Sequence, residues 1–204
     1  MKISHKELES CRFSPKRWVA SRQSGGGWPT FGYKQALSFA ISTFHGTGSI
    51  SAAKAKVDGY VAKNFKDAKR IAMLYEYLEE YAKWFAASGI ISADSNILLA
   101  YPYKSNWQLG GLISRVDFLQ SGYRAVLFEG IVPGWKDQLR MPLIQTAIAE
   151  KYGRPATEVR VGVQEVDTNT LTDTRYSVAV RSAAEAEFKG IGAQVLKIWP
   201  KPTP

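Results

Sequence analysis

The chain has 204 residues, enough for one domain with a sizeable core, and its 45% hydrophobic and 12% aromatic content excludes a disordered chain. No apolar run approaches the roughly 20 residues that span a bilayer, and the start MKISHKELESC has no signal-peptide core, so we expect a cytoplasmic protein. The single cysteine excludes an internal disulfide. The formal net charge of +9 favours a polyanionic partner such as nucleic acid, the alternative being a basic but inert surface.

The N-terminal half of the sequence predicts helices. Capping signals mark two helix starts, at Ser4 with Glu7 three positions later and at Ser14 followed by Pro15. A glycine-rich loop is predicted at 24–32. Three further segments have apolar residues at helical spacing, and they are 33–45, 49–65 and 65–89.

Beyond Gly89 the period of the apolar residues shortens, which predicts strands. We expect three strands to form one antiparallel meander because short turns join them. A fourth should run parallel to one of these, because helix 137–153 precedes it. Residues 174–180 are predicted to be a fifth strand and 181–199 the closing helix. The first four strands are 96–102, 108–118, 123–130 and 158–166.

This order of elements predicts a mixed α/β fold. The sequence contains no internal repeat and no low-complexity segment beyond the glycine-rich loop. We expect residues 1–64 to form an N-terminal helical region that packs on an α/β core of residues 65–204. The two parts together should make a single compact domain.

Two acidic side chains lie within apolar strands of the predicted meander. Asp117 is near the end of the second strand, and Glu129 is near the end of the third. A carboxylate is costly to bury unless a cation, a hydrogen-bond donor or a metal ion accompanies it. One interpretation is a site that both acids share. The alternative is a pair of ordinary strand-end acids, one of them in an ion pair with Arg115 or Arg124.

The long helix, three strands, helix and further strand resemble the αβββαβ core of the PD-(D/E)XK nuclease superfamily, which has a restriction-endonuclease-like fold. The likeness is greatest to its RecB- and Cas4-type nucleases. Their second strand ends in G-x-I/V-D, their third in an acid and a lysine, and a Q-x-x-x-Y helix follows. Here SRVD supplies Asp117 with Ser114 at the glycine position, LFEGI supplies Glu129, and LIQTAIAEKYG supplies Gln145.

Two further stretches resemble the same family. ISHKELESCRFSPKRW is similar to the N-terminal motif of RecB-like nucleases, and SFAISTFHGTG is similar to their helix with a metal-binding histidine, here His45. The resemblance implies a divalent-metal-dependent deoxyribonuclease in which Asp117, Glu129 and His45 hold Mg²⁺ or Mn²⁺. The alternative for His45 is a helix-end histidine that interacts with the last carbonyls of its helix.

The sequence also departs from the family pattern. Ile131 stands where the family has its lysine, so catalysis would need another cation, for which Lys136 and Arg140 are the candidates. Gln145 is followed by Ala149 where the motif has tyrosine, so Gln145 is either a DNA contact or a core or helix-surface amide. Three of the four cysteines that hold an iron–sulfur cluster in many Cas4 proteins have no counterpart, and no such cluster is expected.

The N-terminal segment combines basic and aromatic residues. Lys16, Arg17 and Arg22 lie close in sequence to Trp18 and Trp28. Basic side chains contact phosphates and aromatic rings stack on bases, so these residues are candidate nucleic-acid contacts. The alternative is an amphipathic helix with Trp18 in the core and its charges in solvent.

The first functional hypothesis is a divergent RecB/Cas4-like protein that is a subunit of a defence, repair or mobile-element processing system. Its expected nucleic acid is DNA in preference to RNA. Further protein subunits are then its expected partners, and no membrane is involved. The second hypothesis is a catalytically inactive relative that serves as a nucleic-acid-binding or assembly subunit, which Ile131 favours. The third is a basic α/β adaptor that binds only protein.

Overall fold

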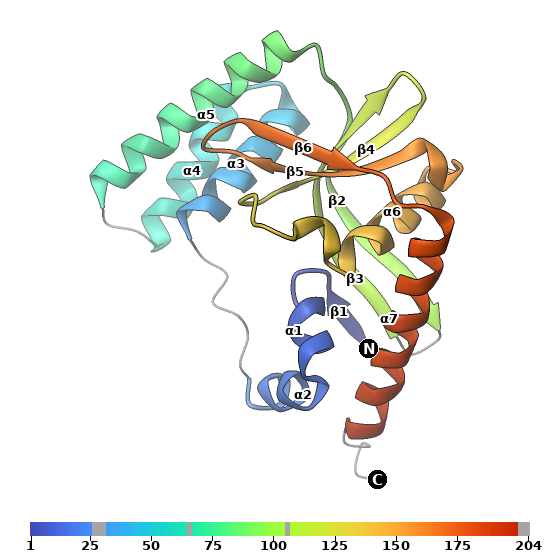
Figure 1. The fold of residues 1–204 in the computed structure, drawn as a ribbon. Helices are drawn as coiled ribbons and strands as arrows, with labels where there is room; N and C mark the ends of the chain where they lie inside the picture. Colours follow the sequence, from blue (N-terminus) through green and yellow to red (C-terminus); the bar gives the residue numbers. More distant parts are fainter. Residues whose placement is uncertain (26–31, 65–66, 105–106, 200–204) are drawn as a thin grey trace.

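The computed structural model describes residues 1–25, 32–64, 67–104 and 107–199, and these form a mixed sheet with helices on both faces (Figure 1). Strands β2, β3 and β4 form an antiparallel meander, β5 lies parallel to β4, and β6 lies antiparallel to β5. The predicted meander and its parallel neighbour are therefore confirmed. The strands are β2 (Ile91–Lys104), β3 (Trp107–Leu119), β4 (Gly122–Phe128), β5 (Val159–Glu165) and β6 (Thr170–Thr174).

A sixth strand was not predicted from the sequence. Residues Lys2–Ser4 form β1, which pairs in parallel with β3 at Gln108–Gly110. Ser4 therefore ends a strand, and the first helix starts only at Leu8. The capping pair still forms in part, because the Ser4 amide donates to a Glu7 carboxylate oxygen (3.3 Å).

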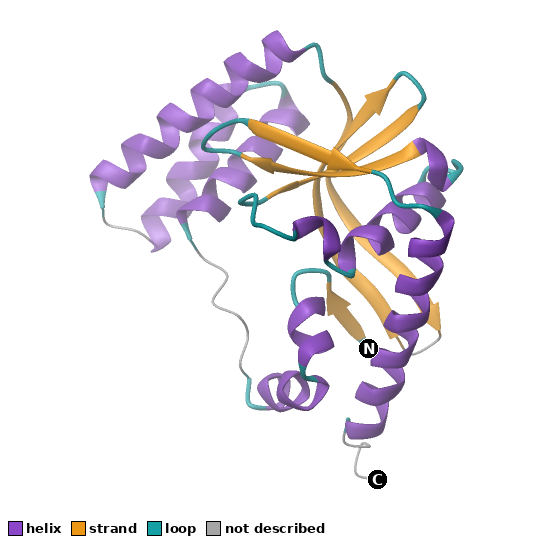
Figure 2. Cartoon of the chain, viewed as in Figure 1, coloured by secondary structure: helices purple, strands orange, loops and turns teal. Residues whose placement is uncertain are grey.

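Helices cover the two faces of the sheet (Figure 2). Long helix α5, the meander, α6 and β5 follow one another in the chain, so the predicted αβββαβ order is confirmed. The three helices α3–α5 pack on one face, and α6 and α7 pack on the other together with the N-terminal pair α1 and α2. The helices are α1 (Leu8–Phe13), α2 (Pro15–Gln23), α3 (Tyr33–Thr47), α4 (Ile50–Asn64), α5 (Ala68–Ser88), α6 (Arg140–Lys151) and α7 (Val178–Ile198), with 3₁₀ turns at Trp135–Asp137 and Ala156–Glu158.

Alternation along β4 divides the core into two layers. Ala125 and Leu127 pack with α6 and α7, whereas Val126 and Phe128 pack under α3–α5. Strand β4 is thus buried on both faces, as expected for a strand with a parallel neighbour and helices on each side. No helix in the described part of the chain is long and apolar enough to cross a membrane.

The prediction of a fifth strand at 174–180 is wrong. The strand lies upstream, at Thr170–Thr174, and α7 already begins at Val178. Ser177 is the reason, because its side chain accepts from the amide of Val180 and so caps the helix. The N-cap signal at Ser177 outweighs the β-branched residues that follow it.

Two fully buried glutamines give a matched test of this packing. Gln145 on α6 donates to the carbonyls of Ala156 (2.7 Å) and Tyr176 (3.2 Å) and accepts from the Tyr176 amide (2.7 Å). Gln164 on β5 has no partner for either amide atom among the described residues. We expect Gln164→Met to raise the free energy of unfolding by about 1–3 kcal/mol, because it removes a buried unsatisfied amide. Gln145→Met should lower the free energy of unfolding by a similar amount, because it removes a satisfied amide. If urea denaturation shows equal effects of the two variants, the contrast between a satisfied Gln145 and an unsatisfied Gln164 is wrong.

Candidate functional site

Asp117 on β3 is fully buried between two arginines. The Arg115 guanidinium donates to both carboxylate oxygens, from Nε (2.5 Å) and Nη2 (3.1 Å). Arg124 on β4 donates to Oδ2 from Nε (3.0 Å) and Nη2 (2.9 Å). Neither Asp117 nor Arg115 is exposed at all, and the guanidinium donors replace the water that the carboxylate loses on burial.

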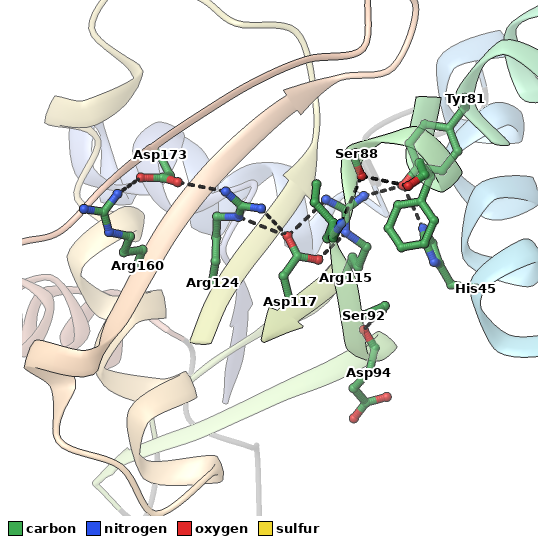
Figure 3. A network of polar contacts seen from close by, with 12 residues as sticks. His45, Tyr81, Ser88, Ser92, Asp94, Arg115, Asp117, Arg124, Arg160 and Asp173 are labelled. Carbon is green, nitrogen blue, oxygen red and sulfur yellow. Dashed lines mark hydrogen bonds and ion pairs between the residues drawn. The ribbon is translucent and has the colours of Figure 1, made fainter. Parts of the chain in front are cut away.

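These residues belong to a row of polar side chains that crosses the sheet from α3 to β6 (Figure 3). On one side Arg115 donates to the hydroxyl of Tyr81 on α5. On the other, Arg124 donates to Asp173 on β6 (3.0 Å), which also accepts from Arg160 (2.6 Å). The row therefore joins two helices of one layer to four strands of the sheet, β3, β4, β5 and β6.

His45 ends the row on the helical side. Its Nε2 lies 2.7 Å from the Tyr81 hydroxyl. Because Arg115 already donates to that oxygen, the hydroxyl of Tyr81 donates its own hydrogen bond to the imidazole of His45. Burial and, secondly, the charge of Arg115 lower the pKa of His45 to about 4. His45 is thus a neutral acceptor in the polar network of Asp117, and it does not line the cavity of Glu129, with which a shared metal site was expected.

Glu129 lies elsewhere, just after β4. Arg140 at the start of α6 donates to both of its oxygens (3.0 and 2.6 Å). Burial alone would raise the pKa of Glu129, but the hydrogen bonds and charge of Arg140 hold it below its usual range. Arg140 also lies 3.3 Å from Nδ1 of His5, whose Nε2 donates to the Leu112 carbonyl (3.1 Å). Burial and then Arg140 lower the pKa of His5 to about 4.

The separation of the two acids follows from the hairpin register. Asp117 is paired with Arg124, and Glu129 lies five residues further along the same strand and its extension. At about 3.3 Å per residue the two acids are roughly 16 Å apart. Ligands of one Mg²⁺ lie about 2 Å from it, so Asp117 and Glu129 do not share an ion. The prediction that Asp117 and Glu129 meet is wrong. Each acid lies near the C-terminal end of its strand, and the C-terminal ends of two antiparallel strands lie at opposite ends of the strand pair.

Glu129 lines a cavity of about 410 Å³ between the sheet, α3 and the turn before α1. Ser114 on β3 lines the same cavity, and its hydroxyl accepts from the Phe128 amide (3.0 Å). The residue of β3 that lines this cavity together with Glu129 and has a polar side chain is therefore a serine. The lining residues are Ser4, His5, Lys6, Gln35, Ser38, Phe39, Leu112, Ser114, Phe128 and Glu129.

These residues do not fit a catalytic divalent ion. Mg²⁺ and Mn²⁺ need several oxygen ligands, but among the described residues one carboxylate lines this cavity, and an arginine donates to both of its oxygens. Across the described ranges no three His, Cys, Asp or Glu side chains come close enough to hold a metal ion.

Other predicted site residues have mixed outcomes. Arg140 does lie beside Glu129, whereas Lys136 is exposed and packs over the ring of Trp135 (5.7 Å). Gln145 is a buried structural amide, so its assignment as a DNA contact is wrong.

The basic N-terminal residues lie on α2. Lys16 and Arg17 are exposed, while Arg22 pairs with Glu7 (2.6 Å) and lies over the ring of Trp18 (5.7 Å). Trp18 is buried, as the core alternative expected. Trp28, the other tryptophan named for this segment, lies outside the described residues.

Sequence reasoning missed His5 and Ser114. In a hairpin with a tight QSG turn, residue 117 pairs with residue 124. The same register places Glu129 opposite residues 112–114, which would have indicated Ser114 as its neighbour on the adjacent strand. No sequence signal identifies His5, because it reaches Arg140 only through the unexpected pairing of β1 with β3.

Comparison with known proteins supports the fold. A solved structure described as a putative exonuclease from Eubacterium rectale matches 88% of this chain and 72% of its own, with a TM-score of 0.56 and 6% sequence identity. At that identity the likeness concerns the fold alone, and it is consistent with a nuclease-like architecture. No family model and no curated protein matches the sequence.

The two buried histidines predict a specific pH dependence. Both have folded-state pKa values of about 4, below the usual 6.5, so the unfolded chain binds protons that the folded protein does not. Stability should be fully present above pH 6.5. It should fall by about 1 kcal/mol per pH unit for each histidine as the pH drops toward 4. Urea denaturation between pH 7 and 5 measures this slope, and His5→Gln with His45→Gln should flatten it. An unchanged slope would contradict the prediction.

Proposed function

We propose that this protein is a divergent RecB/Cas4-like member of the PD-(D/E)XK superfamily that binds DNA without cleaving it. We further propose that it works in the cytoplasm with other subunits of a defence, repair or mobile-element system. The order of the core elements and the likeness to an exonuclease-like fold support the nuclease ancestry. The net charge of +9 supports an anionic partner.

The observation that carries the loss of cleavage is the bidentate pairing of Arg140 with Glu129. In the resembled family this acid, with a lysine two residues on, belongs to the catalytic centre. Here both oxygens of Glu129 accept from Arg140, residue 131 is isoleucine, and the neighbouring strand residue in the cavity is Ser114. The arginine charge thus occupies the place where a metal ion would have to bind.

Exposed cations on α2 support a contact with phosphates. Lys16 and Arg17 are exposed and have no ion pair among the described residues, so they are available to an anionic ligand. Arg22 is already paired with Glu7 and contributes less. Each phosphate contact releases counterions and so adds to the salt dependence of binding.

Anisotropy titration of labelled DNA at several salt concentrations tests this function. We expect salt-dependent binding whose log–log slope becomes shallower by about 1–2 in Lys16→Glu/Arg17→Glu. The control Lys56→Glu/Lys83→Glu makes the same change in net charge on α4 and α5 and should change the slope less. Equal effects of the two pairs would remove α2 from the contact surface.

A cleavage assay with Mg²⁺ or Mn²⁺ tests the other half of the proposal. We expect no product from the wild type, whereas metal-dependent cleavage of DNA would overturn the inactive assignment. Ser114→Asp combined with Arg140→Ala serves as a positive control for metal binding. It releases Glu129 and places a second carboxylate in the same cavity, so calorimetry should detect Mn²⁺ binding that the wild type lacks.

A further inference from the structure

Strand β2 lies at an edge of the sheet, and part of its outer side lines a groove. Of the described strands, β3 alone pairs with β2. The groove has a volume of about 370 Å³ and is lined by Leu98–Tyr101 of β2 and by Ala147, Glu150 and Lys151 of α6. Side chains of consecutive strand residues point to opposite faces, so four residues in a row line one groove only along their backbone edge.

The hydrogen bonds of β3 show which of its residues face β2. The amide of Gln108 donates to the carbonyl of Met1 (3.0 Å), and the carbonyl of Gly110 accepts from the amide of His5 (2.7 Å). The Leu112 carbonyl accepts from Nε2 of His5 on the same side (3.1 Å). Even-numbered residues in this part of β3 therefore face β1, and the odd-numbered residues between them face β2.

The outward groups of β2 follow from this register. Leu99 is paired with Gly111, so the N–H and C=O groups of Leu99 bond to β3. Backbone groups alternate along a strand, and those of Leu98 and Ala100 therefore point away from the sheet. The side chain of Leu98 is 65% exposed, and Ala100 is exposed on the same face. The edge thus offers donors, acceptors and an apolar surface to a further strand.

Two residues limit this open edge to a short segment. Asn96 has a positive φ of 54°, which interrupts the extended backbone before Ile97. Pro102 has no N–H, which ends the row of donors on the other side. The two interruptions lie at equal distances in sequence from Leu99, so the segment Ile97–Tyr101 has this residue at its centre. The segment contains no charged residue, although charges are a common guard of exposed edges.

We infer that this edge pairs with the same edge of a second copy of the chain, β2 antiparallel to β2, in a two-fold symmetric dimer. In the register centred on Leu99, Leu98 of each copy is opposite Ala100 of the other, and each such pair exchanges both of its N–H···O bonds. Centring the pair on Leu98 or on Ala100 instead brings Asn96 or Pro102 into the ladder and loses bonds. The inference goes beyond the proposed function and does not depend on DNA binding.

The side chains around this register are also self-complementary. Leu98 of one copy and Ala100 of the other form cross-strand apolar pairs on one face, so each exposed leucine loses contact with water. On the other face the symmetry brings the two α6 helices toward each other, so Glu150 of one copy can pair with Lys151 of the other. The small side chain of Ala147 leaves room for this approach.

Sedimentation equilibrium at several protein concentrations, in low and in high salt, tests the dimer. We expect a concentration-dependent dimer that tightens several-fold with added salt, because salt screens the repulsion between two chains of charge +9. DNA binding should weaken under the same change, so the two kinds of association are distinguishable. A wild type that stays monomeric in all conditions would overturn the inference and leave the proposed DNA binding untouched.

Two variants of equally exposed residues on β2 locate the contact. Leu98 and Ile91 are both 65% exposed, but Ile91 does not line the groove. We expect Leu98→Lys to weaken the dimer about tenfold or more, and Ile91→Lys, which makes the same change in charge, to weaken it far less. Ala100→Pro should act like Leu98→Lys, because it removes an outward N–H and no bond to β3, and urea denaturation should confirm its fold. Equal effects of the two lysine variants would contradict pairing through this edge.

Disulfide trapping tests the register. Directly opposed residues have Cα atoms about 5.5 Å apart, within reach of a disulfide, whereas diagonal neighbours are about 7–8 Å apart. A mixture of the Leu98→Cys and Ala100→Cys proteins should therefore cross-link several-fold faster than either protein alone. Cys11 is buried and does not compete. If either protein alone cross-links as fast as the mixture, the pairing centred on Leu99 is wrong.

Discussion

The buried ion pair of Arg115 with Asp117 is the interaction on which the sheet and the α3–α5 layer depend. Both side chains are fully buried, and removal of Asp117 would leave Arg115 as an uncompensated charge in the core. Arg115 also packs between the rings of Phe85 (5.4 Å) and Phe128 (5.6 Å), so its position fixes α5 against β4. Through Tyr81 and Arg124 the same pair connects α3 with β6.

Asp117 and Glu129 therefore both have structural roles. Asp117 neutralises two arginines inside the sheet, and Glu129 anchors the start of α6 through Arg140. Each carboxylate is therefore satisfied by guanidinium groups, which match its geometry in a bidentate manner. The α1–α2 pair instead carries exposed cations, an exposed ring and unpaired polar atoms.

Much of the fold could be predicted from the sequence because its signals are local. The meander is predictable because apolar alternation and short turns specify antiparallel pairing, and α5 has a long apolar face that ends at Gly89. Strand β1 has only three residues, and its pairing with β3 spans about a hundred positions, which no local pattern indicates. Residues 174–180 were misassigned because β-branched residues are favoured in strands, while Ser177 caps a helix.

The site was harder to predict because its partners come from distant segments. The alternative that Asp117 pairs with Arg115 or Arg124 agrees with the structure, and it needed only neighbours within one hairpin. The pairing of Glu129 with Arg140 and His5 depends on where α6 and β1 dock. Motif likeness placed both acids in one site, although the antiparallel register separates them by about 16 Å.

The most direct test of the structural role of Asp117 is the free energy of unfolding of Asp117→Asn, with and without Mg²⁺. We expect a loss of about 3–5 kcal/mol, because Arg115 would remain buried without its counter-charge, and no stabilisation of the wild type by Mg²⁺. The exposed acid Asp94 provides the control, since Asp94→Asn should change stability by less than about 1 kcal/mol. A fully stable Asp117→Asn variant, together with a wild type that Mg²⁺ stabilises, would contradict this and identify Asp117 as a metal ligand.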